Sequence, residues 1–286
     1  MRRELRGAML LALGTVLGTS GSAAVIYNNL TPNNSMAMAS RPDTASSEIE
    51  TADDFLLTSP TNILSASFIG LAVPGAQGGN FSVSQVAVEI YRVFPNDSDT
   101  VRTPNVLTRA NSPSDVAFDS RDSAAGQLSF STSVLASTFT ALNSVQPGGI
   151  HPAPNSTTGG NGPVTGQEVQ FDVSFVTPFI LPGDHYFFVP QVLLTNGAQF
   201  YWLSASRPIS GAGTTPFAPD LQAWTRDANL DPDWLRVGTD IVGGSPAPQF
   251  NAAFSLNGVT APEPSSILLV LGGLALIGAR KYRASC

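Results

Sequence analysis

A two-residue hydrophobic period recurs through the middle of this chain. Residues 169–175 read Val-Gln-Phe-Asp-Val-Ser-Phe, and segments 250–256, 86–90 and 64–68 alternate in the same way. Because successive side chains of a strand point to opposite faces, this period predicts strands with one apolar face. No segment outside the two chain ends offers three turns of helical periodicity. We therefore predict an all-β fold, an antiparallel, jelly-roll-like β-sandwich, with a barrel as the alternative.

One segment of the middle region is apolar without alternation. Residues 186–194 form this continuous run, which predicts a central strand buried on both faces, and Pro190 inside it predicts a bulge or a break. The dipeptide Asn196-Gly197 follows and is a strong signal for a two-residue hairpin turn. We therefore predict that 184–195 and 199–206 pair as a β-hairpin.

Charged residues are scarce, and their balance is acidic. They make up 12% of the 286 residues, against a usual ~25%, with a net charge of −7. Nucleic-acid binding needs clustered cations, so we expect no nucleic-acid partner. Cys286 is the only cysteine, which excludes an internal disulfide and a Cys-based zinc site. Residues 25–261 hold eight Arg, no Lys and 19 Asp plus Glu, a net charge of about −11.

The N-terminus has the order of a secretory signal peptide. A basic start with Arg2, Arg3 and Arg6 precedes the apolar stretch 8–17, and Ser22-Ala23-Ala24 fits the small-x-small cleavage rule. We predict a signal helix within residues 1–24 and cleavage after Ala24 by signal peptidase, with passage through the export machinery.

The following domain boundaries come from composition. Residues 31–50 are polar and lack periodicity, so residues 25–52 are predicted to form a flexible N-terminal arm. The β-sandwich ectodomain is predicted to cover 53–259, and a C-terminal signal to cover 260–286.

The C-terminus combines a proline-rich triplet, an apolar stretch and a basic end. Pro262, Glu263 and Pro264 precede the apolar residues 267–279. The basic end contains Arg280, Lys281 and Arg283. A helix over 267–279 is ~20 Å long, so it spans a ~30 Å hydrocarbon core only with help from its flanking residues. The basic end belongs on the cytoplasmic side, which places the body outside.

This tail, residues 262–283, resembles the PEP-CTERM sorting signal of exported proteins of Gram-negative bacteria. The resemblance implies that an exosortase-type membrane protease recognises Pro262, Glu263 and Pro264 and cuts near them. It also implies transient anchoring in the inner membrane by a short transmembrane helix, followed by transfer to the cell surface or the extracellular space. Segments 52–57, 63–70 and 250–258 resemble the β-sandwich ectodomains that often accompany this tail, most of which have no known function.

One acidic loop has the spacing of a cation site. Oxygen ligands recur at every second residue, namely Asp227, Asn229, Asp231 and Asp233. Ca²⁺ takes 6–8 oxygen ligands, but Pro232 and Gly238 stand where an EF-hand needs its turn glycine and its bidentate Glu. The loop is therefore either a calcium loop of another kind or a solvated acidic turn. We expect no other cofactor.

Aromatic residues are the remaining candidates for a binding site. Trp202, Trp224 and Trp234 are either a platform for sugar rings or core residues. His185 follows Asp184 but has no catalytic partner in the sequence, and no nucleophile elbow is present, so we assign no catalytic residues.

These patterns predict a non-enzymatic exported surface or extracellular-matrix protein in contact with extracellular polysaccharide. The alternatives are a calcium-dependent carbohydrate-binding module, and a β-sandwich hydrolase or lyase.

Overall fold

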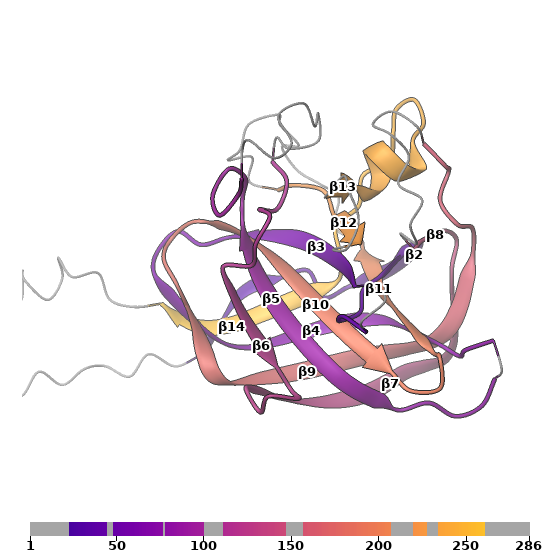
Figure 1. Ribbon diagram of the computed structural model, residues 1–286, viewed down its shortest axis with the longest axis horizontal. Helices are drawn as coiled ribbons and strands as arrows, with labels where there is room; N and C mark the ends of the chain where they lie inside the picture. Colours follow the sequence, from indigo (N-terminus) through magenta and orange to yellow (C-terminus); the bar gives the residue numbers. More distant parts are fainter. Residues whose placement is uncertain are drawn as a thin grey trace, which may run out of the picture.

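The computed structural model describes residues 23–44, 48–76, 78–99, 111–146, 157–206, 220–227 and 234–260 (Figure 1). Most of the predicted signal peptide and the C-terminal signal, from residue 261 onward, lie outside these ranges. Among the described residues, no helix has the length and hydrophobicity needed to cross a membrane.

The described chain is all-β, as predicted, and its strands form two sheets. The larger sheet has eight strands. Six of them run in the spatial order β1 (Ala24–Asn28), β14 (Phe254–Thr260), β4 (Thr61–Val73), β11 (Gln199–Ala205), β2 (Pro32–Ala39) and β8 (Ser144–Val145). The other two are β9 (Val164–Leu181), which pairs with β4, and β7 (Leu128–Ala141), which pairs with β9.

The smaller sheet has six strands. Their order is β13 (Leu235–Arg236), β12 (Trp224–Asp227), β3 (Ile49–Leu56), β10 (His185–Leu194), β5 (Val83–Arg92) and β6 (Asp119–Asp122). A π-helical turn, η1 (Val237–Val242), follows β13 directly. In Figure 1, β12, β13 and η1 lie together at the top right of the molecule.

Residues from both sheets form one hydrophobic core. The alternation in β9 is confirmed, since Phe171 and Val173 are buried in this core together with Val86 and Val88 of β5. Aromatic rings connect the sheets: Phe188 of β10 stacks on Phe254 of β14 with ring centroids 5.1 Å apart. Burying one such ring contributes about 1.5–3 kcal/mol, so this shared core is a major source of stability.

The predicted flexible arm over residues 25–52 is wrong. These residues contain β1, β2 and the start of β3, and Met36 and Met38 of β2 have no solvent exposure. The sequence of β2 reads as polar because Asn and Ser fill its first half. Its second half, however, pairs with β11 and is buried against the core, and such long-range pairing overrides weak local strand preference.

The predicted hairpin is also wrong, although both of its strands exist. β10 pairs with β3 and β5, whereas β11 pairs with β2 and β4 of the other sheet. Asn196 and Gly197 have the positive φ values of a hairpin turn, 58° and 70°. β5 pairs with one edge of β10 along nearly its whole length, and β3 pairs with the other edge only as far as Phe188. Beyond Phe188, Val192 N donates to the Ser40 carbonyl at 3.3 Å, so the segment around Ser40 lies where β11 would have to pair. The turn therefore carries the chain from one sheet to the other.

The prediction of a central strand buried on both faces is confirmed in β10, where only Leu193 is partly exposed. The expected break at Pro190 appears on one side of the strand alone. Pairing with β3 ends at Phe188 opposite Asp53, whereas pairing with β5 continues through Pro190 opposite Val88.

Candidate functional site

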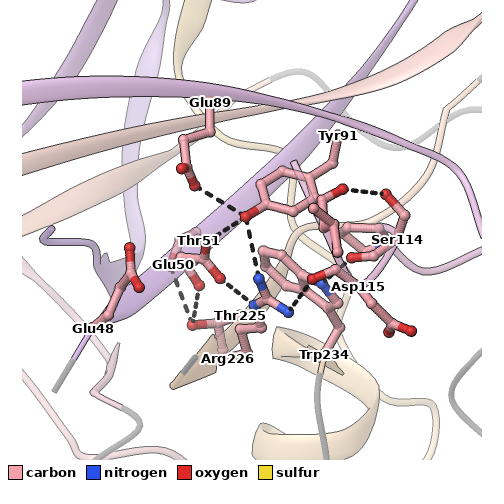
Figure 2. A network of polar contacts seen from close by, with 12 residues as sticks. Glu48, Glu50, Thr51, Glu89, Tyr91, Ser114, Asp115, Thr225, Arg226 and Trp234 are labelled. Carbon is pink, nitrogen blue, oxygen red and sulfur yellow. Dashed lines mark hydrogen bonds and ion pairs between the residues drawn. The ribbon is translucent and has the colours of Figure 1, made fainter. Parts of the chain in front are cut away.

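Charged side chains gather on the face of the smaller sheet that points away from the shared core. Within β3, Glu50 and Asp54 share this face, because residues two and four apart project on the same side. Glu89 and Tyr91 lie on the same face of β5. Arg226 of β12 lies opposite Glu50. We call the set of Glu48, Glu50, Glu89, Tyr91, Arg226 and Trp234 the outer polar cluster (Figure 2).

Hydrogen bonds connect the members of this cluster around the Tyr91 hydroxyl. Tyr91 Oη donates to Glu50 Oε1 at 2.5 Å and lies 3.0 Å from Glu89 Oε2. Arg226 Nη2 donates to the same hydroxyl at 3.1 Å, and Arg226 Nε donates to Glu50 Oε2. A phenol has one proton, so Tyr91 cannot donate fully to both carboxyls at once, and a proton on Glu89 would satisfy the second contact.

The electrostatics agree with a protonated Glu89. Burial, and then the charge of Glu50, raise the pKa of Glu89 to about 9. Burial and the charge of Glu50 also raise the pKa of Glu48. Burial on its own would raise the pKa of Glu50, but the charge and hydrogen bond of Arg226 outweigh it and leave that pKa below its ordinary value. At neutral pH the cluster therefore contains the Glu50–Arg226 ion pair beside a neutral Glu89.

Aromatic and backbone groups close over the cluster. The Trp234 ring centroid lies 4.6 Å from the Arg226 guanidinium carbon and packs edge-on against Tyr91, with centroids 5.4 Å apart. Trp234 Nε1 donates to the Ser114 carbonyl at 2.9 Å, and Arg226 Nη1 donates to the Asp115 carbonyl at 3.2 Å. These contacts attach the segment around residues 114 and 115 to the smaller sheet.

The cluster can keep a proton on one carboxyl and neutralise the charge of another with Arg226. Oxygens of Glu48, Glu50 and Glu89 lie within 4.8 Å of one another, a spacing that suits a cation, and the Arg226 guanidinium already supplies one. A neutral carboxyl beside an ionised one is also the pairing that acid–base catalysis uses. Tyr91, however, bonds to Glu50, and Trp234 packs on Arg226, so the contacts at the centre of the cluster join β3, β5 and β12.

A second buried polar group lies farther along the same face. His185 Nε2 contacts Asp54 Oδ2 at 2.5 Å, and Asp54 Oδ1 accepts from the Leu221 backbone N–H at 2.8 Å. Burial raises the pKa of Asp54 despite the hydrogen bond to His185. Burial and the neighbouring Asp54 raise the pKa of Asp53 well above its ordinary range. Residues 54 and 185 are far apart in sequence, so their contact had no local signal.

The predicted aromatic platform is wrong. Trp202, Trp224 and Trp234 are 0%, 1% and 2% exposed, so none offers a ring face to a ligand from solvent. Trp202 lies in the shared core and donates its indole N–H to the Ala253 carbonyl at 2.9 Å. Trp224 and Trp234 lie in a separate cluster on the outer face. All three tryptophans are therefore core residues, which was the other interpretation of them.

The predicted calcium loop is described only at its first residue. Asp227 ends β12, is buried, and pairs with Ile49 of β3. Asn229, Asp231 and Asp233 lie outside the described residues, so calcium binding stays a prediction.

The outer polar cluster was not predicted, although the sequence contains a partial signal for it. Glu48 and Glu50, like Glu89 and Tyr91, are two residues apart, which on a strand places both side chains on one face. No sequence signal indicated that they meet Arg226, which is more than 130 positions away from Glu89. No family model, curated protein or solved structure matches this chain, so its function must be argued from its own residues.

Proposed function

We propose that this protein is a non-enzymatic exported surface or extracellular-matrix protein whose body is a jelly-roll-like β-sandwich. In this proposal a signal peptide directs export, and the C-terminal PEP-CTERM-like signal holds the body at the inner membrane until an exosortase-type protease releases it. The observation that carries the proposal is the pairing of β1 with β14.

That pairing brings the two ends of the described body together. β1 and β14 are antiparallel neighbours, and Ala24 lies opposite Gly258, two residues before β14 ends. The segments that precede Ala24 and follow Thr260 therefore join the body at the same end of the same sheet. This arrangement suits a domain that is tethered and processed at both chain ends, because both junctions lie at one end of the sheet.

The expected cleavage site is compatible with a stable body. Ala24 and Val25 begin β1 at the edge of the sheet and are exposed, with Val25 at 62%. Of the described residues, cutting between them removes only Ala23 and Ala24, and both are exposed. The remaining body has no cysteine and keeps its shared core, which suits a protein that folds after export without disulfides.

The distribution of titratable groups supports a non-enzymatic role. Tyr91 and Trp234 pack against each other at the Glu50–Arg226 pair of the outer polar cluster, and Glu50 is 2% exposed. A substrate would have to displace these side chains to reach Glu50, whereas Glu48 and Glu89 are partly exposed. The contacts of the cluster instead connect three strands of the smaller sheet, which is a structural task.

The test is mass spectrometry of the exported protein purified from its native cells. We expect an N-terminus at Val25 and a C-terminus near Pro264. A variant with Pro262→Ala, Glu263→Ala and Pro264→Ala should stay in the membrane fraction with its C-terminus intact. The matched control Thr260→Ala, just before the triplet, should be processed normally. A wild-type protein that ends at Cys286 would leave only a tail anchor and contradict the sorting proposal.

A further inference from the structure

Two adjoining cavities lie away from the outer polar cluster, beside β7 and β9. Their volumes are about 410 and 390 Å³, and Phe81 and Gln167 line both of them. We call them together the lateral cleft. Each volume falls within the ~300–1,000 Å³ that small-molecule sites occupy.

The wall that bears Phe81 is held in place from both sides. Ser82 N donates to Thr195 Oγ1 at 2.9 Å, and Thr195 N donates back to the Ser82 carbonyl at 2.9 Å. Asn196 Nδ2 donates to the Asn80 carbonyl at 2.6 Å. The turn that carries the chain from β10 to β11 thus fixes Phe81 at the junction of the two cavities. A preorganised wall of this kind lowers the entropy cost of binding.

The two halves of the cleft differ in chemistry. One half is mostly apolar and is lined by side chains that include Phe130, Val134, Val169 and Phe171. The other half is lined by residues with hydroxyl or amide side chains, namely Asn80, Ser137, Thr138, Thr165 and Gln167. Among the residues that the structure describes, no Asp, Glu, Lys, Arg or His lines either half.

These properties define the ligand. A charged group in the cleft would lose hydration without meeting an opposite charge, which is costly. The net charge of −7 disfavours anions further. Hydrocarbon suits the apolar half, and a group rich in hydroxyls suits the half lined by hydroxyl and amide residues, with Phe81 lining both halves. We propose that the lateral cleft binds an uncharged amphiphile that has a sugar headgroup and a hydrocarbon portion.

This proposal is independent of the sorting proposal, because it concerns the folded body wherever the protein resides. The probe is octyl glucoside, used below its critical micelle concentration with the full-length protein, and titration calorimetry measures its affinity. Glucose and octyl sulfate are the comparison ligands. We expect octyl glucoside to bind at least tenfold more tightly than either one.

Two variants locate the binding site. Phe81→Ala should weaken binding of octyl glucoside by about tenfold, because it removes the ring shared by both halves. Gln167→Leu should also weaken binding of octyl glucoside. In this variant, the affinity for octyl glucoside should come closer to the affinity for octanol, a plain alkyl chain. Ile180→Ala, at the far end of β9 and 71% exposed in the wild type, is the control and should change nothing. Circular dichroism of each variant checks that it is folded.

Three results would overturn the proposal. The first is that octyl glucoside does not bind. The second is that octyl sulfate binds as tightly, which contradicts the preference for uncharged ligands. The third is binding that Phe81→Ala and Gln167→Leu leave unchanged, which places the ligand elsewhere on the chain, for example on the apolar C-terminal segment.

Discussion

Arg226 of β12 and Glu50 of β3 face each other across an antiparallel strand pair and form a buried ion pair, with side-chain exposures of 8% and 2%. The cluster around them uses arginine as its cation in a body that has no lysine. The guanidinium also packs on Trp234, a contact that suits its planar shape. The pair therefore connects β12 to β3 in the interior of the protein.

Removing the cation should destabilise the protein strongly. Arg226→Met leaves Glu50 buried without its partner, which typically costs about 3–5 kcal/mol in the free energy of unfolding. Arg92→Met is the matched control, because the Arg92–Asp97 pair has side-chain exposures of 30% and 24%. A partly exposed pair, which solvent screens more than a buried one, is worth up to about 1 kcal/mol. Urea denaturation of both variants measures the difference, and equal losses would contradict the assigned role of the buried pair.

Stability should fall as the pH rises from about 5 to about 9. Glu89 has a pKa of about 9 when folded and an ordinary value of 4.5, so in this range the folded protein holds a proton that the unfolded chain has lost. Glu89→Gln mimics the protonated form and should flatten the dependence, by at most about 1.4 kcal/mol per pH unit. Denaturation midpoints across the pH range test this. A variant with the wild-type slope would show that Glu89 is ionised in the folded state.

The core between the sheets should tolerate truncation poorly. Phe188→Ala removes the ring that stacks on Phe254 and packs edge-on against Trp202, and such truncations cost about 3–5 kcal/mol. Ile180→Ala removes an exposed side chain and should stay within about 0.5 kcal/mol of the wild type. Thermal unfolding of the two variants compares them. A small loss for Phe188→Ala would mean that the sheets do not depend on this contact.

The N-terminal strands should be essential for folding. Met38→Asp places a charge at a fully buried position of β2, at a cost of several kcal/mol, and should prevent a cooperative unfolding transition. Val25→Asp makes the same kind of change in β1 at a side chain that is 62% exposed, and should fold normally. Near-ultraviolet circular dichroism distinguishes the outcomes. A folded Met38→Asp protein would restore the interpretation of residues 25–52 as a flexible arm.

Local patterns were sufficient wherever one strand's own side chains decide its environment. The alternation of Val169, Phe171 and Val173 and the continuous apolar run of β10 both predicted strands whose burial the structure confirms. In these cases the hydrophobic effect acts on consecutive residues, so the period of the sequence carries the information.

Local patterns were insufficient wherever the choice of partner decides the outcome. Asn196-Gly197 has the backbone conformation of a hairpin turn, but β5, β3 and the segment around Ser40 already bond to β10. The polar start of β2 hid a strand whose pairing with β11 buries Met38. No short window of sequence contains such competition between partners.

The sequence by itself determined that this chain forms sheets, that its body is acidic and free of thiols, and which segments at its ends resemble export signals. Only the tertiary structure decided which strands pair, that the three tryptophans are buried, and that Glu50, Glu89, Tyr91 and Arg226 meet in one cluster. The physical reason is that composition and hydrophobic period are properties of consecutive residues. Strand pairing, burial of a whole ring and compensation of a buried charge depend on residues that are distant in sequence.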